Sequence, residues 1–188
     1  MSNWVEVMGL EQQYWKFVDR YSTDHLSELM QVHGQEVWNY AYFLTKHQDW
    51  ADDITQDVFL RIYRSPNTFR GESSVRTWLF AITRNCVFNY RRSAFLRKVT
   101  LMGRVKHSGE APSAESEALA NQYIDEIWES VMALPAKYRE VLILDARYEL
   151  SLKEIADITG LSIGTVKSRL SRARRKAAEI WKGGVVYE

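Results

Sequence analysis

Residues 151–174 read SLKEIADITGLSIGTVKSRLSRAR and predict a helix, a short glycine turn and a second helix. The Ser151 hydroxyl can accept a hydrogen bond from the Glu154 amide while the Glu154 carboxylate accepts one from the Ser151 amide, which makes a capping box. Gly160 suits the left-handed conformation that follows a helix end, and Ser162 can cap the second helix. This order is typical of helix-turn-helix units that read DNA.

The second helix of this unit has an apolar and a polar side. Apolar residues recur at helical spacing and are expected to be buried: Ile163, Val166, Leu170 and Ala173 or Ala177. Early side chains of such a helix face base edges in the major groove, and later ones neutralise phosphates. The candidate DNA-contacting residues are Ser162, Thr165, Lys167, Ser168, Arg169, Arg172, Arg174, Arg175 and Lys176. A structural three-helix domain with a basic surface helix is the alternative.

The whole chain of 188 residues has a net charge of only +1, but its charges are segregated. Residues 49–60 and 108–136 contain acidic residues and no Lys or Arg, whereas residues 73–109 and 166–176 contain Lys and Arg and no acidic residue. Two basic blocks separated by an acidic one indicate two surfaces that face a polyanion.

Apolar residues recur with helical period almost throughout and no stretch alternates with period two, so the sequence predicts an all-α protein. Helices are expected over about 23–46, 50–64, 75–92, 119–132 and 136–148, before the helix-turn-helix. The segment around Gly103, Gly109 and Pro112 has no apolar stripe and predicts a flexible linker. We therefore expect two small helical domains joined by a linker. The expected parts are an extension (1–22), a first domain (23–96), the linker (97–116), a helix-turn-helix domain (117–182) and a tail (183–188).

The third expected helix combines arginines with aromatic side chains. Such a surface suits unstacked bases, because rings stack on the bases and guanidinium groups hold the phosphates. Trp78 and Phe80 are equally well explained as core residues, whereas Phe88 and Tyr90 have polar neighbours and are expected on an exposed face. The loop at residues 67–71 is suited to receive an extruded base.

The expected helix over residues 50–64 carries an acidic face. Its members are Asp49, Asp52, Asp53, Gln56, Asp57 and Leu60. Asp53 and Asp57 are four residues apart and share one side of the helix. Because nucleic acid would repel this face, it is a candidate docking site for a basic partner protein. A solvated helix face with acidic residues near its N-terminus explains it equally well.

Other classes of function lack the residues that they need. Cys86 is the single cysteine and the four histidines have no metal-ligand spacing, so we expect no metal site. Asp52, Asp53 and Asp57 form the one carboxylate cluster, and no motif supports two-metal chemistry, so we expect no enzyme, cofactor or small-molecule substrate. No membrane span or signal peptide is indicated, and we expect a cytoplasmic protein.

Taken together, these residues resemble the extracytoplasmic-function (ECF) group of bacterial sigma-70 factors over about residues 26–178. Three stretches carry the resemblance. They are DDITQDVF at 52–59, the segment 69–92 with RTWLFAITRN at 76–85, and the segment 134–174 with GTVKSRLSRAR at 164–174. The resemblance implies a promoter-specificity subunit of RNA polymerase that performs no catalysis itself.

The resemblance also implies a role for each surface. The acidic face would dock on the clamp helices of the largest polymerase subunits. The helix over residues 162–174 would bind the minus-thirty-five promoter element. The minus-ten element would be contacted by Asn67, Phe69, Arg70, Arg84, Asn85, Phe88, Asn89, Tyr90, Arg91 and Arg92. A cognate anti-sigma factor, often membrane-bound, would hold the protein inactive until envelope stress releases it to transcribe stress or envelope genes.

The competing hypothesis is an autonomous helix-turn-helix regulator that binds duplex DNA as a dimer. It accounts for residues 151–176 but gives no role to the acidic face or to the helix that mixes arginines with aromatic residues. The aromatic-rich residues 1–22 extend beyond the usual start of the sigma-factor pattern.

Overall fold

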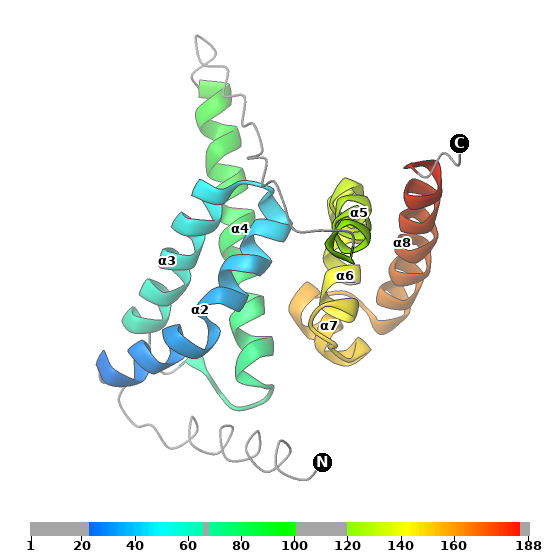
Figure 1. Ribbon diagram of the computed structural model, residues 1–188. Coiled ribbons are helices and arrows are strands. Elements are labelled where there is room, and N and C mark those ends of the chain that lie inside the picture. Colours follow the sequence, from blue (N-terminus) through cyan, green and yellow to red (C-terminus); the bar gives the residue numbers. More distant parts are fainter. Residues whose placement is uncertain (1–22, 66–67, 101–119, 185–188) are drawn as a thin grey trace. The chain divides into compact units, whose positions relative to one another are not determined.

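The computed structural model describes residues 23–65, 68–100 and 120–184 (Figure 1). These residues form seven helices, α2 to α8, and contain no β-strand, so the all-α prediction is confirmed for this part of the chain. The expected extension (1–22) lies outside the described residues, as do residues 101–116 of the expected linker and residues 185–188 of the expected tail. The chain divides into two compact units with a boundary near Ser93.

The first unit contains α2 (Thr23–Thr45), α3 (Gln48–Arg64) and the part of α4 (Val75–Thr100) that ends at Ser93 (Figure 1). Helices α2 and α3 pack against each other. The prediction ended α4 near Arg92, but no proline or glycine follows until Gly103, so nothing in the sequence stops the helix at Arg92. Helix α4 therefore includes residues 97–100, which were assigned to the linker.

All three helices contribute side chains to the core of the first unit. The stripe predicted for α3, Ile54, Val58 and Ile62, is buried with at most 1 % of each residue exposed. Tyr40 of α2 packs on Phe80 of α4 with ring centroids 4.7 Å apart, and both are buried. Phe80 is therefore a core residue, one of the two interpretations left open by the sequence.

An ion pair joins α2 to α4. The Arg76 guanidinium donates to both carboxylate oxygens of Glu36, over 2.7 and 3.2 Å, and His33 lies 3.2 Å from the same carboxylate. Burial by itself raises the pKa of Glu36, but the hydrogen bonds from His33 and Arg76 outweigh it and hold that pKa below its ordinary value. Glu36 therefore stabilises the unit in its charged form.

The second unit contains α5 (Ala120–Ala133), α6 (Ala136–Ala146), α7 (Leu152–Thr159) and α8 (Ile163–Gly184) (Figure 1). Seven consecutive residues of α6, from Tyr138 to Leu144, are buried, so this helix is covered nearly all round. The buried Arg139 donates to the carbonyls of Met132 and Leu134 and thereby satisfies the end of α5.

The predicted helix-turn-helix is formed by α7 and α8. The capping box is complete: the Glu154 amide donates to the Ser151 hydroxyl over 3.3 Å, and the Ser151 amide donates to the Glu154 carboxylate over 2.9 Å. Gly160 has the expected left-handed conformation, with φ of 66°. The Ser162 hydroxyl accepts a hydrogen bond from the Thr165 amide over 3.2 Å and thereby caps α8.

The predicted apolar stripe of α8 is confirmed at Val166, Leu170 and Ala173, which are all buried. The prediction was wrong for Ile163, which is 45 % exposed. Ile163 is the first residue of α8. No earlier turn of the helix lies beside it, so helical spacing alone does not bury it.

We predict that Glu36→Gln lowers the free energy of unfolding by about 1 kcal/mol near pH 7, because a charge-assisted pair becomes a neutral contact. Since the pKa of Glu36 is lowered in the folded protein, its contribution is complete above its unfolded pKa of about 4.3 and is lost as the pH falls through the folded value. Urea denaturation at about pH 7 and about pH 3.5 tests this.

Glu28→Gln is the matched control, because Glu28 is an exposed residue of the same helix. It should leave stability unchanged at both pH values. A loss for Glu36→Gln that is equally large at both pH values would contradict the ion-pair explanation.

Candidate functional site

The acidic face predicted for α3 is on the surface. Asp49, Asp52, Asp53, Gln56 and Leu60 are exposed, and Asp57 is partly exposed. The face results from the burial of the apolar stripe of the same helix, which turns the intervening residues outward.

Three of these carboxylates have partners within the first unit. The Trp38 indole Nε1 donates to Asp52 Oδ1 over 2.6 Å, and the Tyr90 hydroxyl donates to Asp53 Oδ2 over 2.8 Å. Asp57 pairs with Arg61 over 2.9 Å on the same helix. The carboxylates are thus held by neighbouring side chains while they remain accessible.

Tyr63, which was not among the predicted site residues, extends the acidic face with an aromatic ring. Tyr63 is 52 % exposed and Leu60 is 48 % exposed. The two residues are three apart in α3 and therefore lie on one side of the helix. The spacing of 56, 60 and 63 could have revealed this residue, since it continues the line of Gln56 and Leu60.

Several predicted DNA-contacting residues of α4 are on the surface. Asn85, Phe88, Asn89 and Arg92 are exposed. The Arg84 guanidinium lies over the Phe88 ring, 4.5 Å from its centroid, which leaves a cation and a ring together on this surface.

Tyr90 and Arg91 point toward the other helices of the first unit. The Tyr90 ring packs on Trp50 with centroids 5.2 Å apart, and its hydroxyl reaches Asp53. The Arg91 guanidinium donates to the Leu44 carbonyl near the end of α2. The structure therefore gives both residues a role within the unit, and their contact with DNA stays a prediction.

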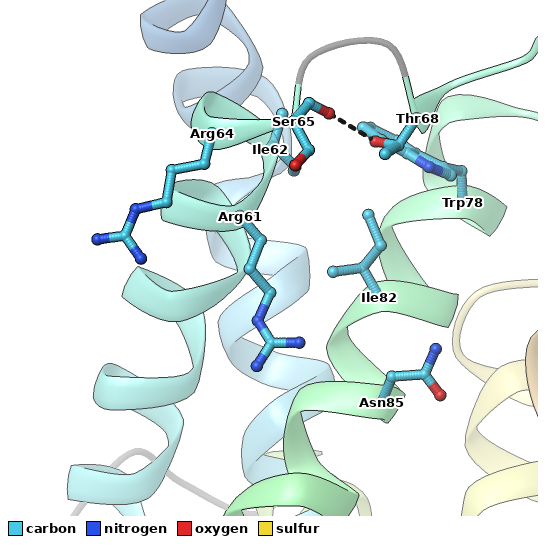
Figure 2. A pocket seen from close by; sticks show the side chains of 8 residues that line it. All are labelled: Arg61, Ile62, Arg64, Ser65, Thr68, Trp78, Ile82 and Asn85. Carbon is cyan, nitrogen blue, oxygen red and sulfur yellow. Dashed lines mark hydrogen bonds between the residues drawn. The ribbon is translucent and has the colours of Figure 1, made fainter.

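The ends of α3 and α4 enclose a hollow of about 390 Å³ (Figure 2). Its lining residues are Arg61, Ile62, Arg64, Ser65, Thr68, Trp78, Ile82 and Asn85. Figure 2 shows Arg61 of α3 on the side of Ile82 and Asn85 of α4, whereas the Arg64 side chain extends away from α4. The Thr68 hydroxyl donates to the Ser65 carbonyl over 3.0 Å. Of this lining, Asn85 is a predicted site residue, and Thr68 belongs to the loop that was expected to receive an extruded base. The sequence did not indicate that the end of α3 forms one wall.

The described part of the loop after α3 contributes to the hollow and to the packing beside it. Thr68 lines the hollow, and Phe69 packs on Trp78 with centroids 5.2 Å apart. Arg70 is exposed. The predicted contact Asn67 lies outside the described residues.

The basic residues of α8 differ in their surroundings. Lys167, Ser168, Arg172, Arg174 and Arg175 are exposed, and Thr165, Arg169 and Lys176 are half-buried, while Ser162 caps the helix.

Two of the α8 arginines are engaged by α6. Arg174 pairs with Asp145 over 2.7 Å. A hydrogen bond with Arg172 lowers the pKa of Tyr138. The basic residues of α8 therefore differ: Arg172 and Arg174 interact with side chains of α6, although the sequence alone does not distinguish them from their neighbours.

The described part of the chain shows neither a metal-binding cluster nor a reactive cysteine. It contains no group of three His, Cys, Asp or Glu side chains placed to hold a metal ion. Cys86 is buried, and this burial raises the pKa of its thiol to about 12, so it stays protonated near neutral pH. None of the described helices has the length and apolar character that crossing a membrane requires.

Residues 29–95 match the family model of sigma-70 region 2, and residues 124–176 match that of sigma-70, region 4. The chain belongs to the sigma-70 family. The first matched segment contains the acidic face, the hollow and most of α4. The second contains α7 and the first part of α8, which form the helix-turn-helix. The chain is therefore a promoter-specificity subunit of RNA polymerase.

Individual relatives place this sigma factor in the ECF group. It is 30 % identical over 153 residues to RNA polymerase sigma factor YlaC of Bacillus subtilis, covering 80 % of this chain and 88 % of YlaC. It is 33 % identical over 151 residues to the ECF sigma factor SigL of Mycobacterium tuberculosis, covering 78 % of this chain and 83 % of SigL.

A solved structure supports the same fold. The sigma factor RpoE of Bartonella quintana, crystallised with the anti-sigma factor NepR, is 29 % identical. It matches with a TM-score of 0.70 over 87 % of this sigma factor and all of RpoE.

Proposed function

We propose that this ECF sigma factor acts through three separate surfaces, one for polymerase and two for promoter DNA. The observation that carries the proposal is the opposite chemistry of two helices in the first unit. Helix α3 exposes carboxylates with Leu60 and Tyr63, whereas α4 exposes Phe88 and Arg92 among polar residues. A polyanion is repelled by the first surface and attracted to the second.

The acidic face is proposed to dock on core RNA polymerase. Its carboxylates complement a basic partner and set the orientation of the encounter. Leu60 and Tyr63 add exposed apolar area beside them, and aromatic side chains are frequent anchors of protein interfaces. This combination fits a protein partner better than a solvated helix face.

The hollow between α3 and α4 is proposed to receive one extruded base of the minus-ten element. Its mixed lining offers Trp78 and Ile82 for apolar contact and Arg61 and Asn85 as hydrogen-bond donors. Extruded bases are held in this way, by apolar or aromatic contacts and polar contacts to the base edge. Asn89 and Arg92 would contact the same melted strand beyond the hollow.

Helix α8 is proposed to read the minus-thirty-five element in the major groove. Thr165, Lys167, Ser168 and Arg169 lie in its first two turns, from which base edges are reached. The exposed Arg175 lies later and is suited to a phosphate.

In this scheme the protein has no catalytic chemistry or cofactor of its own and works in the cytoplasm on the nucleoid. By analogy with RpoE of Bartonella quintana, which was crystallised with the anti-sigma factor NepR, an anti-sigma factor is proposed to control it. A membrane-bound anti-sigma factor would hold it at the inner membrane face and release it for stress or envelope genes.

The whole proposal is tested by co-purification with core RNA polymerase, followed by run-off transcription on a library of promoter fragments. Stoichiometric binding and start sites that share two spaced motifs are expected. A protein that ignores polymerase but shifts duplex DNA by itself would instead be an autonomous regulator.

We predict that Asp53→Lys abolishes binding to core polymerase while the helical content stays unchanged. The exposed side chain is replaced by one of opposite charge, which repels a basic partner without disturbing the core. Pull-down of the core enzyme measures the loss. Glu28→Lys makes the same charge change on α2 and should bind normally; equal loss for both variants would point to net charge alone.

We predict that Asn85→Ala reduces discrimination at one position of the melted strand by about 1–3 kcal/mol, since one polar contact to the base edge disappears. Promoters with each base, or with an abasic site, at that position measure the effect. Asn89→Ala is the control, because Asn89 is exposed one turn later and does not line the hollow. Discrimination that is unchanged in Asn85→Ala would exclude the hollow as a base pocket.

We predict different outcomes for two arginines of α8. Arg169→Ala should lose about 1–3 kcal/mol at particular upstream bases, whereas Arg175→Ala should weaken all promoters alike and reduce the salt dependence of binding. Holoenzyme affinity for a set of minus-thirty-five variants at several salt concentrations measures both. A uniform loss for Arg169→Ala would make Arg169 a phosphate contact.

A further inference from the structure

Two adjacent carboxylates of α3 are held by aromatic side chains that come from two different helices. Trp38 of α2 donates its indole N–H to Asp52, and Tyr90 of α4 donates its hydroxyl to Asp53. The partners are 14 and 37 residues apart in the chain, so tertiary packing alone brings them together.

Each aromatic donor is itself held by a second ring. Trp38 stacks on Tyr42 with an interplanar angle of 7° and centroids 5.5 Å apart. Tyr90 packs on Trp50 with centroids 5.2 Å apart, and Trp50 packs on His47 at 4.7 Å. A ring that is packed in this way has few alternative rotamers, so its donor stays directed at the carboxylate.

We propose that Trp38 and Tyr90 are positioning residues for polymerase docking, which fix the carboxylates of Asp52 and Asp53 in the orientation that the polymerase binds. The inference rests on the docking function proposed for the acidic face. Exposed aspartates otherwise sample several rotamers, and ordering them on binding costs affinity. Side chains ordered before binding avoid this cost.

The geometry leaves the carboxylates able to bind a partner. Trp38 uses Oδ1 of Asp52, and Tyr90 uses Oδ2 of Asp53, so each bond takes one of two oxygens. A carboxylate accepts several hydrogen bonds, and both donors are neutral, so the negative charge is kept. In contrast, Asp57 pairs with Arg61, and this ion pair compensates its charge.

In the docking surface, Tyr90 has a role apart from the DNA contact predicted for it. A phenol hydroxyl has one proton, so while it is donated to Asp53 it is not donated to a phosphate. The neighbouring Arg91, which donates to the Leu44 carbonyl, helps to anchor this part of α4 against the end of α2. Tyr90 therefore belongs to the docking surface although its sequence position lies in the DNA-binding helix.

The test is a double-mutant cycle on the affinity of the full chain for core polymerase. Tyr90→Phe removes one hydroxyl and keeps the ring on Trp50, and it should weaken binding by roughly threefold to tenfold. In an Asp53→Asn background, Tyr90→Phe should have no further effect, because the carboxylate that it positions is gone. Thermal unfolding should be unchanged within each pair.

Trp38→Phe and Asp52→Asn form a second cycle with the same expected pattern. The control is Tyr42→Phe, which removes a hydroxyl that makes no hydrogen bond to another described residue and keeps the ring that stacks on Trp38. Tyr42→Phe should bind polymerase normally.

The outcomes separate this inference from the docking proposal. If Asp53→Asn and Asp52→Asn leave the affinity unchanged, the acidic face does not dock there and both proposals fail. If these variants weaken binding but Tyr90→Phe and Trp38→Phe do not, only the positioning role fails. It also fails if the aromatic substitutions cost the same affinity with and without the carboxylates, since that result indicates direct contact or a general structural effect.

Discussion

The first unit depends on the burial of one apolar stripe of α3. Ile54, Val58 and Ile62 recur on one side of that helix and are almost inaccessible to solvent. Their burial fixes the rotation of α3 and therefore exposes the carboxylates between them. A rotation that buried Asp53 would cost on the order of several kcal/mol, because its charge would lose water without gaining a cation. The acidic face and the core of α3 are thus one structural feature.

That constraint also explains how one small unit can present an acidic and a basic surface. The polar contacts that join α4 to the other helices use Arg76, Tyr90 and Arg91, which meet Glu36, Asp53 and the Leu44 carbonyl. Asn89 and Arg92 stay exposed. Some basic residues of α4 therefore hold the helices of the first unit together, whereas others are exposed to solvent. The basic block in the sequence combines these two groups.

The sequence predicted features that depend on neighbouring residues. The capping box at Ser151, the left-handed Gly160, the buried stripe of α3 and, apart from Ile163, that of α8 follow from local spacing and were confirmed. Contacts between distant residues were not predictable, because periodicity identifies the inner side of a helix but not its partner. For this reason neither the hydrogen bond from Tyr90 to Asp53 nor the place of Arg61 beside Asn85 in the hollow could be predicted from the sequence. The sequence therefore indicates which helix faces are exposed, but only the packing of the helices shows which distant side chains lie beside them.

In α8 as well, packing makes the six basic residues between 166 and 176 differ from one another. Arg174 is paired with Asp145 over 2.7 Å, with 62 % of its side chain exposed. A phosphate that binds Arg174 must compete with this carboxylate, so the net gain is the difference between two similar ion pairs and is small. Arg175 lies 3.7 Å from Glu179 and is 70 % exposed, a looser pair that a phosphate displaces more readily. The number of Lys and Arg residues in a recognition helix is therefore larger than the number of its phosphate contacts wherever a carboxylate of the same domain already pairs with one of these side chains.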